Sequence, residues 1–174
     1  MDKAWESNSL ATLALSPNRW SSPAVDQVGV IERAERNTKR SLKAETKISG
    51  LKMVLSMIDL TTLEGMDTEG KIRQLCSKAR HLNHQLADLP SVAAVCVYPN
   101  LAGLAKQFLA DSGIQTASVA TAFPSGNAPL ATKLAEVNYA VEAGADEIDM
   151  VISRGRFLRG DYQYVLDEIA AVKE

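Results

Sequence analysis

The sequence predicts an α/β protein of the (β/α)₈ (TIM) barrel class, in which only about the first four strand–helix units are present. Four short apolar segments alternate with segments of helical periodicity from residue 51 onward. These apolar segments are nearly continuous rather than alternating, which is typical of parallel strands buried on both faces. Polar residues stand near the ends of several strands, where barrel enzymes build their active sites.

The chain is too short for a complete barrel of this class. It has 174 residues, whereas eight strand–helix units need about 250. We expect a flexible leader at 1–24, one amphipathic helix at 25–50 and a partial barrel at 51–174. Because right-handed crossovers between parallel strands also build open, flavodoxin-like sheets, the residues alone leave that alternative open.

The first half of the expected barrel segment contains two strand–helix units. An apolar run at 51–60 is interpreted as the first strand, and Thr68 can cap the helix that follows it. The second strand is expected at 92–98. Asn100 can cap the next helix, and Gly113 stops that helix.

Two more strand–helix units follow in the second half of this segment. The third strand is expected at 116–122, and the tight turn 123–127 closes it. A helix at about 130–142 leads to a fourth strand at 147–153, and Asp161 can cap a final helix. Such a half barrel would leave strand edges exposed, so it would tend to form a homo-oligomer or to bind another protein.

Composition and motifs argue against several other classes of protein. A net charge of −2 gives no basic surface for nucleic acid or membrane, and no apolar run approaches the ~20 residues of a membrane helix. Residues 1–22 lack a signal-peptide pattern, so we expect a cytoplasmic protein with free thiols at Cys76 and Cys96. No CxxC or glycine-rich phosphate motif is present, and His81 with His84 lacks an acidic ligand cluster. We therefore expect no metal and no cofactor.

Asp149 is the strongest candidate for a catalytic group. It lies in the fourth expected strand and shares one face of that strand with Glu147 and Val151. A carboxylate inside a buried strand is costly unless it is paired or protonated, and such a group suits proton transfer. The structural alternative is a buried salt bridge, for example with a lysine from another strand.

Two further residues are expected to face the same end of the sheet as Asp149. Asp59 is placed near the carboxyl end of the first strand, where the hydroxyls of Thr61 and Thr62 could orient it. Alternatively, Asp59 is a turn residue that caps backbone N–H groups. Cys96 comes from the second strand and is either part of a pocket or a small buried apolar side chain.

Several segments, taken in order, resemble the deoxyribose-phosphate aldolases. The matching segments include 58–63 (IDLTTL), 94–99 (AVCVYP), 119–126 (VATAFPSG) and 144–152 (GADEIDMVI). The resemblance covers the chain from about residue 51 to residue 174. It is specific because several short motifs occur in the right order and at compatible spacing.

The resemblance implies a class I aldolase that splits 2-deoxy-D-ribose 5-phosphate into D-glyceraldehyde 3-phosphate and acetaldehyde, in the catabolism of deoxyribonucleotides. In this family a lysine forms a Schiff base with the substrate, and the protonated imine accepts electrons when the C–C bond breaks. Asp149 corresponds to the family's proton donor and acceptor. Asp59 and Cys96 correspond to positions that line the pocket, and Thr61 is expected beside them.

The sequence also departs from the pattern of this family. The family's Schiff-base lysine belongs to a sixth strand, and no lysine of this chain is expected to replace it. Lys52 is expected to open the first strand, while Lys106 and Lys133 fall on helices, outside a barrel. Ser153 stands where the family has asparagine, which could alter the pocket. We therefore expect the chain to be inactive alone, either as a fragment of a longer enzyme, which we favour, or as a genuine short protein.

Two other functions remain open at this point. The first is a Schiff-base barrel aldolase that acts on a different phosphosugar. The second is a half-barrel protein without catalytic activity that binds an intact aldolase.

Overall fold

A computed structural model describes residues 24–83, 86 and 88–174. The expected leader at 1–24 therefore lies almost wholly outside the described residues, as does His84. The chain divides into two compact units, and the boundary falls between Ser41 and Leu42. Within the described residues, no helix combines the length and the apolar character that crossing a membrane requires.

Two helices occupy the region where a single helix at 25–50 was expected. Helix α1 spans Gln27–Thr38 and belongs to the first unit, and α2 spans Ala44–Leu55 in the second. The Thr38 hydroxyl closes α1 by donating to the Glu35 carbonyl at 2.8 Å. Ala44 then adopts a positive φ of 47°, which a continuous helix does not allow. The expectation of one helix was wrong for this local reason.

The first strand is also shorter and later than predicted. Strand β1 spans Asp59–Thr61, whereas most of the apolar run 51–60 is the last part of α2. A short apolar run cannot be assigned to helix or strand from periodicity alone, and here the helix prevails. Lys52 accordingly lies on α2 and does not open a strand.

Four parallel strands form one sheet in the order β1-β2-β3-β4. Strand β2 spans Ala94–Val97, β3 spans Gln115–Ala120 and β4 spans Glu147–Met150. The predicted positions of these three strands are confirmed, although each strand is shorter than expected. Every connection between neighbouring strands contains at least one helix, so the prediction of repeated strand–helix units is correct.

Three of the five helices that follow β1 start where the sequence suggested, whereas one starts before its predicted cap and one was not predicted. The helices of this part are α3 (Glu69–Arg80), α4 (Pro99–Phe108), α5 (Leu130–Glu142), α6 (Arg154–Leu158) and α7 (Tyr162–Lys173). Thr68 caps α3 as predicted, since its hydroxyl accepts from the Lys71 N–H. Asn100 does not cap α4, because Pro99 already occupies the first helical position. Asp161 precedes α7 but makes no side-chain cap there.

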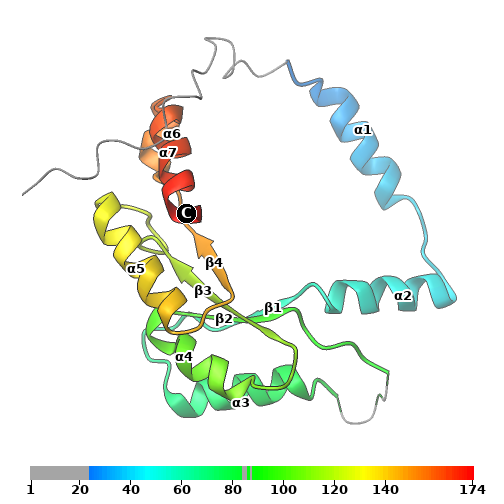
Figure 1. The fold of residues 1–174 in the computed structure, drawn as a ribbon. Coiled ribbons are helices and arrows are strands. Elements are labelled where there is room, and N and C mark those ends of the chain that lie inside the picture. The colour runs from blue at the N-terminus through cyan, green and yellow to red at the C-terminus, as the bar shows by residue number, and fades with distance from the viewer. Residues whose placement is uncertain (1–23, 84–85, 87) are drawn as a thin grey trace, which may run out of the picture. The chain divides into compact units, whose positions relative to one another are not determined.

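The two faces of the sheet have different surroundings. Helices α3 and α4 contact β2, and α4 and α5 contact β3, all along one side of the sheet (Figure 1). On that side Val95 and Val97 pack into an apolar core with Ile72 and Ala105. The opposite face carries a smaller apolar cluster and the polar side chains that the sequence marked as candidates.

Candidate functional site

The structure brings all four predicted site residues to the same face of the sheet. Cα register pairs Thr61 with Cys96, and Cys96 with Ala117. Asp59 lies two residues before Thr61 on β1, and Asp149 is paired with Val119, two residues beyond Ala117 on β3. Since neighbours in register point to the same side of a parallel sheet, these side chains share the face opposite to the helices.

Cys96 lies in the middle of this face and has a perturbed thiol. Its side chain is buried, and burial raises the pKa of the thiol to about 11. The negative charges of Asp149 and Asp59 contribute to this rise in the pKa, while hydrogen bonding to Thr61 and to the Val119 backbone opposes it. The thiol is therefore protonated at neutral pH, which fits a small buried side chain better than a nucleophile.

Asp149 is more exposed than the sequence suggested. We expected a carboxylate inside a buried strand, but the structure leaves Asp149 and Glu147 exposed. The reason is that the apolar cluster on this face, built around Cys96 and Val119, does not cover β4. Asp149 is thus a carboxylate that water or a ligand can reach, beside a largely buried thiol.

The position of Asp59 also differs from the prediction. Asp59 is the first residue of β1 and lies level with Ala94, so it is at the amino end of its strand. The neighbouring hydroxyls do not orient its carboxylate. Thr61 donates to the backbone carbonyl of Asp59 at 3.0 Å, and the buried Thr62 donates to Asp67.

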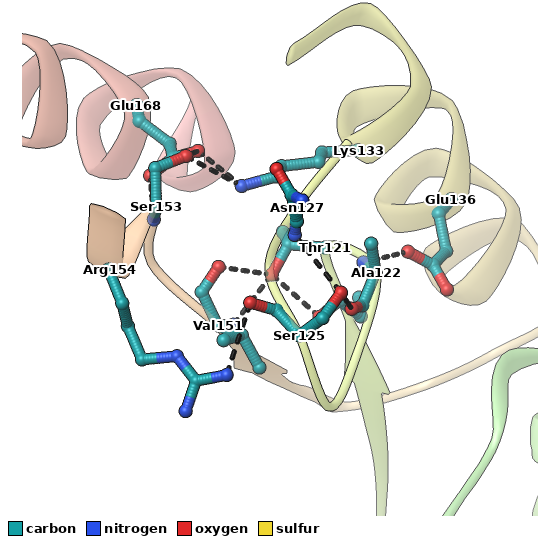
Figure 2. A network of polar contacts seen from close by, with 11 residues as sticks. Thr121, Ala122, Ser125, Asn127, Lys133, Glu136, Val151, Ser153, Arg154 and Glu168 are labelled. Atoms are coloured by element: carbon teal, nitrogen blue, oxygen red, sulfur yellow. Dashed lines mark hydrogen bonds and ion pairs between the residues drawn. The ribbon is translucent and has the colours of Figure 1, made fainter. Parts of the chain in front are cut away.

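A polar network joins the carboxyl ends of β3 and β4 (Figure 2). The Thr121 hydroxyl accepts from the Val151 N–H at 2.6 Å, and the Ala122 N–H donates to Glu136 at 2.7 Å. Thr121 and Ala122 both have positive φ values, 63° and 62°, which are unfavourable for residues with a Cβ. These bonds hold the chain in that conformation as it leaves the sheet.

A buried ion pair, which the sequence analysis missed, lies behind this network. Lys133 and Glu168 are fully buried, and their Nζ and Oε1 atoms are 2.6 Å apart (Figure 2). Ser153 joins them through its hydroxyl, and its N–H donates to Glu168 at 2.7 Å. Burial alone would raise the pKa of Glu168, but the hydrogen bonds from Lys133 and Ser153 lower it.

The helical periodicity of the sequence could have revealed that Lys133 and Glu168 are buried. Lys133 lies four residues before Val137 on α5, and Glu168 lies three residues after Val165 on α7. Both charges therefore occupy the buried stripes of their helices. Ser153, at the position where asparagine was expected, is the residue that links this pair to the end of β4.

The turn after β3 forms part of a cavity of about 790 Å³. Residues 125–129 and 153–156 line it, together with Arg159 and Tyr164. Gly126 permits this arrangement, because its φ is 67° and a Cβ there would lie 2.6 Å from the Ile152 carbonyl oxygen. No group of three potential metal ligands occurs within the described part of the chain.

Comparisons with known proteins extend this picture. Residues 53–174 match the DeoC/LacD family aldolase model. The deoxyribose-phosphate aldolase of Mus musculus is 38% identical over 162 residues, covering 86% of this chain and 51% of the relative. The Homo sapiens enzyme of the same name is 40% identical over 157 residues, covering 83% and 49%. The chain thus spans about half the length of these curated relatives.

Solved structures show the same architecture. A putative deoxyribose-phosphate aldolase from Coccidioides immitis superposes with a TM-score of 0.63 at 24% identity, covering 83% of this chain and 55% of that one. QR15, described as an aldolase, gives a TM-score of 0.60 at 28% identity over 68% of this chain and 49% of that one. The predicted fold is confirmed: the strand–helix units are part of a TIM barrel rather than of a flavodoxin-like sheet.

Proposed function

Because the chain belongs to the DeoC/LacD family of aldolases, we propose that it carries part of a site that cleaves 2-deoxy-D-ribose 5-phosphate into D-glyceraldehyde 3-phosphate and acetaldehyde. The names of the mouse and human relatives support this substrate. In this role the protein would act in the cytoplasm in the catabolism of deoxyribonucleotides. Two free, buried cysteines fit such a reducing compartment.

The observation that carries the proposal is the accessible carboxylate of Asp149 on the face shared with Thr61 and Cys96. In a class I cleavage, the substrate aldehyde is held as an imine on a lysine, and electrons from the breaking C2–C3 bond flow into it. A base must take the proton of the C3 hydroxyl, and an acid must protonate the enamine carbon that remains. We assign this proton transfer to Asp149, with Asp59, Thr61 and Cys96 as pocket-lining groups.

The lysine of such a mechanism does not come from the strands of the described sheet. None of the strands β1–β4 contains a lysine. Lys133 is buried against Glu168, and Lys106 pairs with Asp146 at 2.6 Å on the helical side of the sheet. We therefore propose that this chain forms no Schiff base by itself.

Trapping with sodium borohydride tests this proposal. The chain is incubated with acetaldehyde and borohydride and its intact mass is measured, with a complete aldolase of the family treated in parallel. We expect an adduct on the complete enzyme and none on this chain. A stoichiometric lysine adduct on this chain would disprove the proposal and, after peptide mapping, identify the reactive lysine.

A binding role is the second candidate, and the outer strands of the sheet favour it. Among the described residues, β1 and β4 each pair with a strand on one side only. Open backbone edges of this kind accept further strands. Co-purification of the tagged chain with a full-length aldolase, together with reduced activity of that enzyme, would support this role over catalysis. The remaining alternative is an aldolase that acts on a different phosphosugar. A screen of other phosphosugars as substrates of the complete enzyme would distinguish it from the proposed function.

A further inference from the structure

Three arginines line the cavity at the carboxyl ends of β3 and β4. Arg154 and Arg156 lie on α6, and Arg159 follows that helix directly. The polar side chains of Ser125 and Asn127 line the cavity with them. Asp149, Cys96 and the other candidates on the open sheet face do not line it, so the cavity is separate from the proposed aldolase site.

The three guanidinium groups form polar contacts with two parts of the chain: the carbonyls of the turn after β3 and the carboxylate of Asp161. Arg154 donates through one nitrogen, Nη2, to the carbonyls of Pro124 and Ser125 at 2.8 and 3.2 Å (Figure 2). Arg156 donates through Nη1 to Asp161 at 2.9 Å and lies 4.5 Å from the centre of the Tyr164 ring. Arg159 approaches the same Asp161 carboxylate at 3.9 Å. The hydrogen bonds of Arg154 and Arg156 restrain these two side chains while occupying only part of their donors.

The charge balance of the cavity favours an anion. Three positive guanidinium groups meet one carboxylate, Asp161, among the described side chains that contact them. Lys133 and Glu168, which both contact Ser153 in the cavity lining, form a pair of opposite charges and do not change this balance. Arg154 retains Nε and Nη1, and Arg156 retains Nε and Nη2, for hydrogen bonds to a ligand.

We propose that this arginine cavity binds a phosphate dianion, either free or carried by a small molecule. Planar guanidinium groups donate two parallel hydrogen bonds to phosphate oxygens, and restrained side chains lose little entropy on binding. Its volume lies within the range of small-molecule sites, and Tyr164 and Pro129 offer apolar surface beside the charges. The site needs no catalysis by this chain and stands apart from the proposed aldolase function.

Nitrogen-15 NMR of the full chain provides the test. Inorganic phosphate is titrated at constant ionic strength, and the Nε–Hε signals of the arginines and the amides of Ser125 and Asn127 are followed. We expect saturable shifts at these positions. R156A/R159A should weaken binding at least about tenfold, because each substitution removes charge-assisted hydrogen bonds. R156K/R159K, which keeps the charges near Asp161, should also weaken it, because lysine lacks the planar fork.

A control of equal charge distinguishes a site from general attraction. R33A/R36A removes two positive charges from α1 and should leave phosphate binding unchanged. Equal weakening by both pairs of substitutions, or the absence of saturable shifts, would overturn the proposal. A second titration with ribose 5-phosphate identifies the source of the dianion: tighter binding than inorganic phosphate indicates a phosphorylated small molecule, and equal binding indicates free phosphate.

Discussion

The buried pair of Lys133 and Glu168 makes stability depend on pH in a defined direction. The pKa of Glu168 is lowered in the folded protein, so its stabilising effect is complete above the carboxyl's ordinary value of 4.5. That effect is lost as the pH falls through the lower, folded value. Glu168→Gln removes the anion and leaves Lys133 as a buried, uncompensated charge, which should cost about 3–5 kcal/mol at pH 7.

Urea unfolding as a function of pH measures this effect. The wild-type free energy of unfolding should fall steeply below the ordinary carboxyl pKa, and the Glu168→Gln variant should show a shallower fall from a lower starting value. Glu142→Gln, at an exposed position of α5, is the matched control and should change the stability at pH 7 little. Parallel acid curves for wild type and Glu168→Gln would contradict the assignment.

Single residues differed in how far the sequence could place them. The sequence placed Cys96 only toward the same end of the sheet as Asp149, and the structure shows that Asp149, Cys96 and Thr61 also share one face. Burial of Asp149 could not be predicted, because it depends on which atoms cover that face rather than on the strand itself. Lys133 was misjudged for the opposite reason, since a lysine on a helix is assumed to be exposed unless its buried stripe is inspected.

The turn after β3 depends on Gly126. A substitution of the same kind on the neighbouring helix α6 serves as the control. Gly126→Ala forces a Cβ to within 2.6 Å of the Ile152 carbonyl oxygen at a φ of 67°, so the turn or the segment after β4 must move. We expect a loss of at least about 1–3 kcal/mol in the free energy of unfolding. Gly155→Ala, on α6 with no atom within 4 Å, should instead be neutral or stabilise by up to about 1 kcal/mol.

Thermal or urea unfolding of both variants decides the point. The two substitutions add the same methyl group to neighbouring segments of the same cavity, so composition is matched. A Gly126→Ala variant as stable as wild type would show that the turn tolerates another conformation. Its arrangement around Arg154 would then not be fixed by Gly126.

Among the helices and strands, the sequence best predicted those whose first or last residues are marked by a clear start or stop signal. Helix α5 was placed correctly because Gly144, at a φ of 101°, marks the end of its segment. Strand β1 was misplaced because an apolar run of this length suits helix or strand equally well. Helix α6 was missed because its five residues are too few to show periodicity.

The open face of the sheet is acidic, and the strands β1–β4 contribute no lysine to balance its charge. Asp59, Glu147 and Asp149 all point to this face, and none of β1–β4 supplies a lysine to it. The resemblance to aldolases led us to expect no reactive lysine on these strands, because it places the family's Schiff-base lysine on a sixth strand. If the proposed aldolase function is correct, the positive charge that an imine mechanism needs comes from outside β1–β4.

A chimera tests whether this face is a working part of an aldolase site. The chain is joined to the part of the human relative that it does not cover, so that this chain replaces the matched region. We expect the chimera to cleave 2-deoxy-D-ribose 5-phosphate, and Asp149→Asn to lower kcat by about 10²–10⁴-fold, the usual contribution of a general acid–base group.

Asp111→Asn, at an exposed position in the loop after α4, makes the same chemical change away from the sheet face and should leave kcat unchanged. The borohydride adduct with acetaldehyde should still form in the Asp149→Asn chimera, because imine formation uses the lysine of the human part. Loss of both the adduct and the activity would point to misfolding. Full activity of the Asp149→Asn chimera would remove Asp149 from the mechanism.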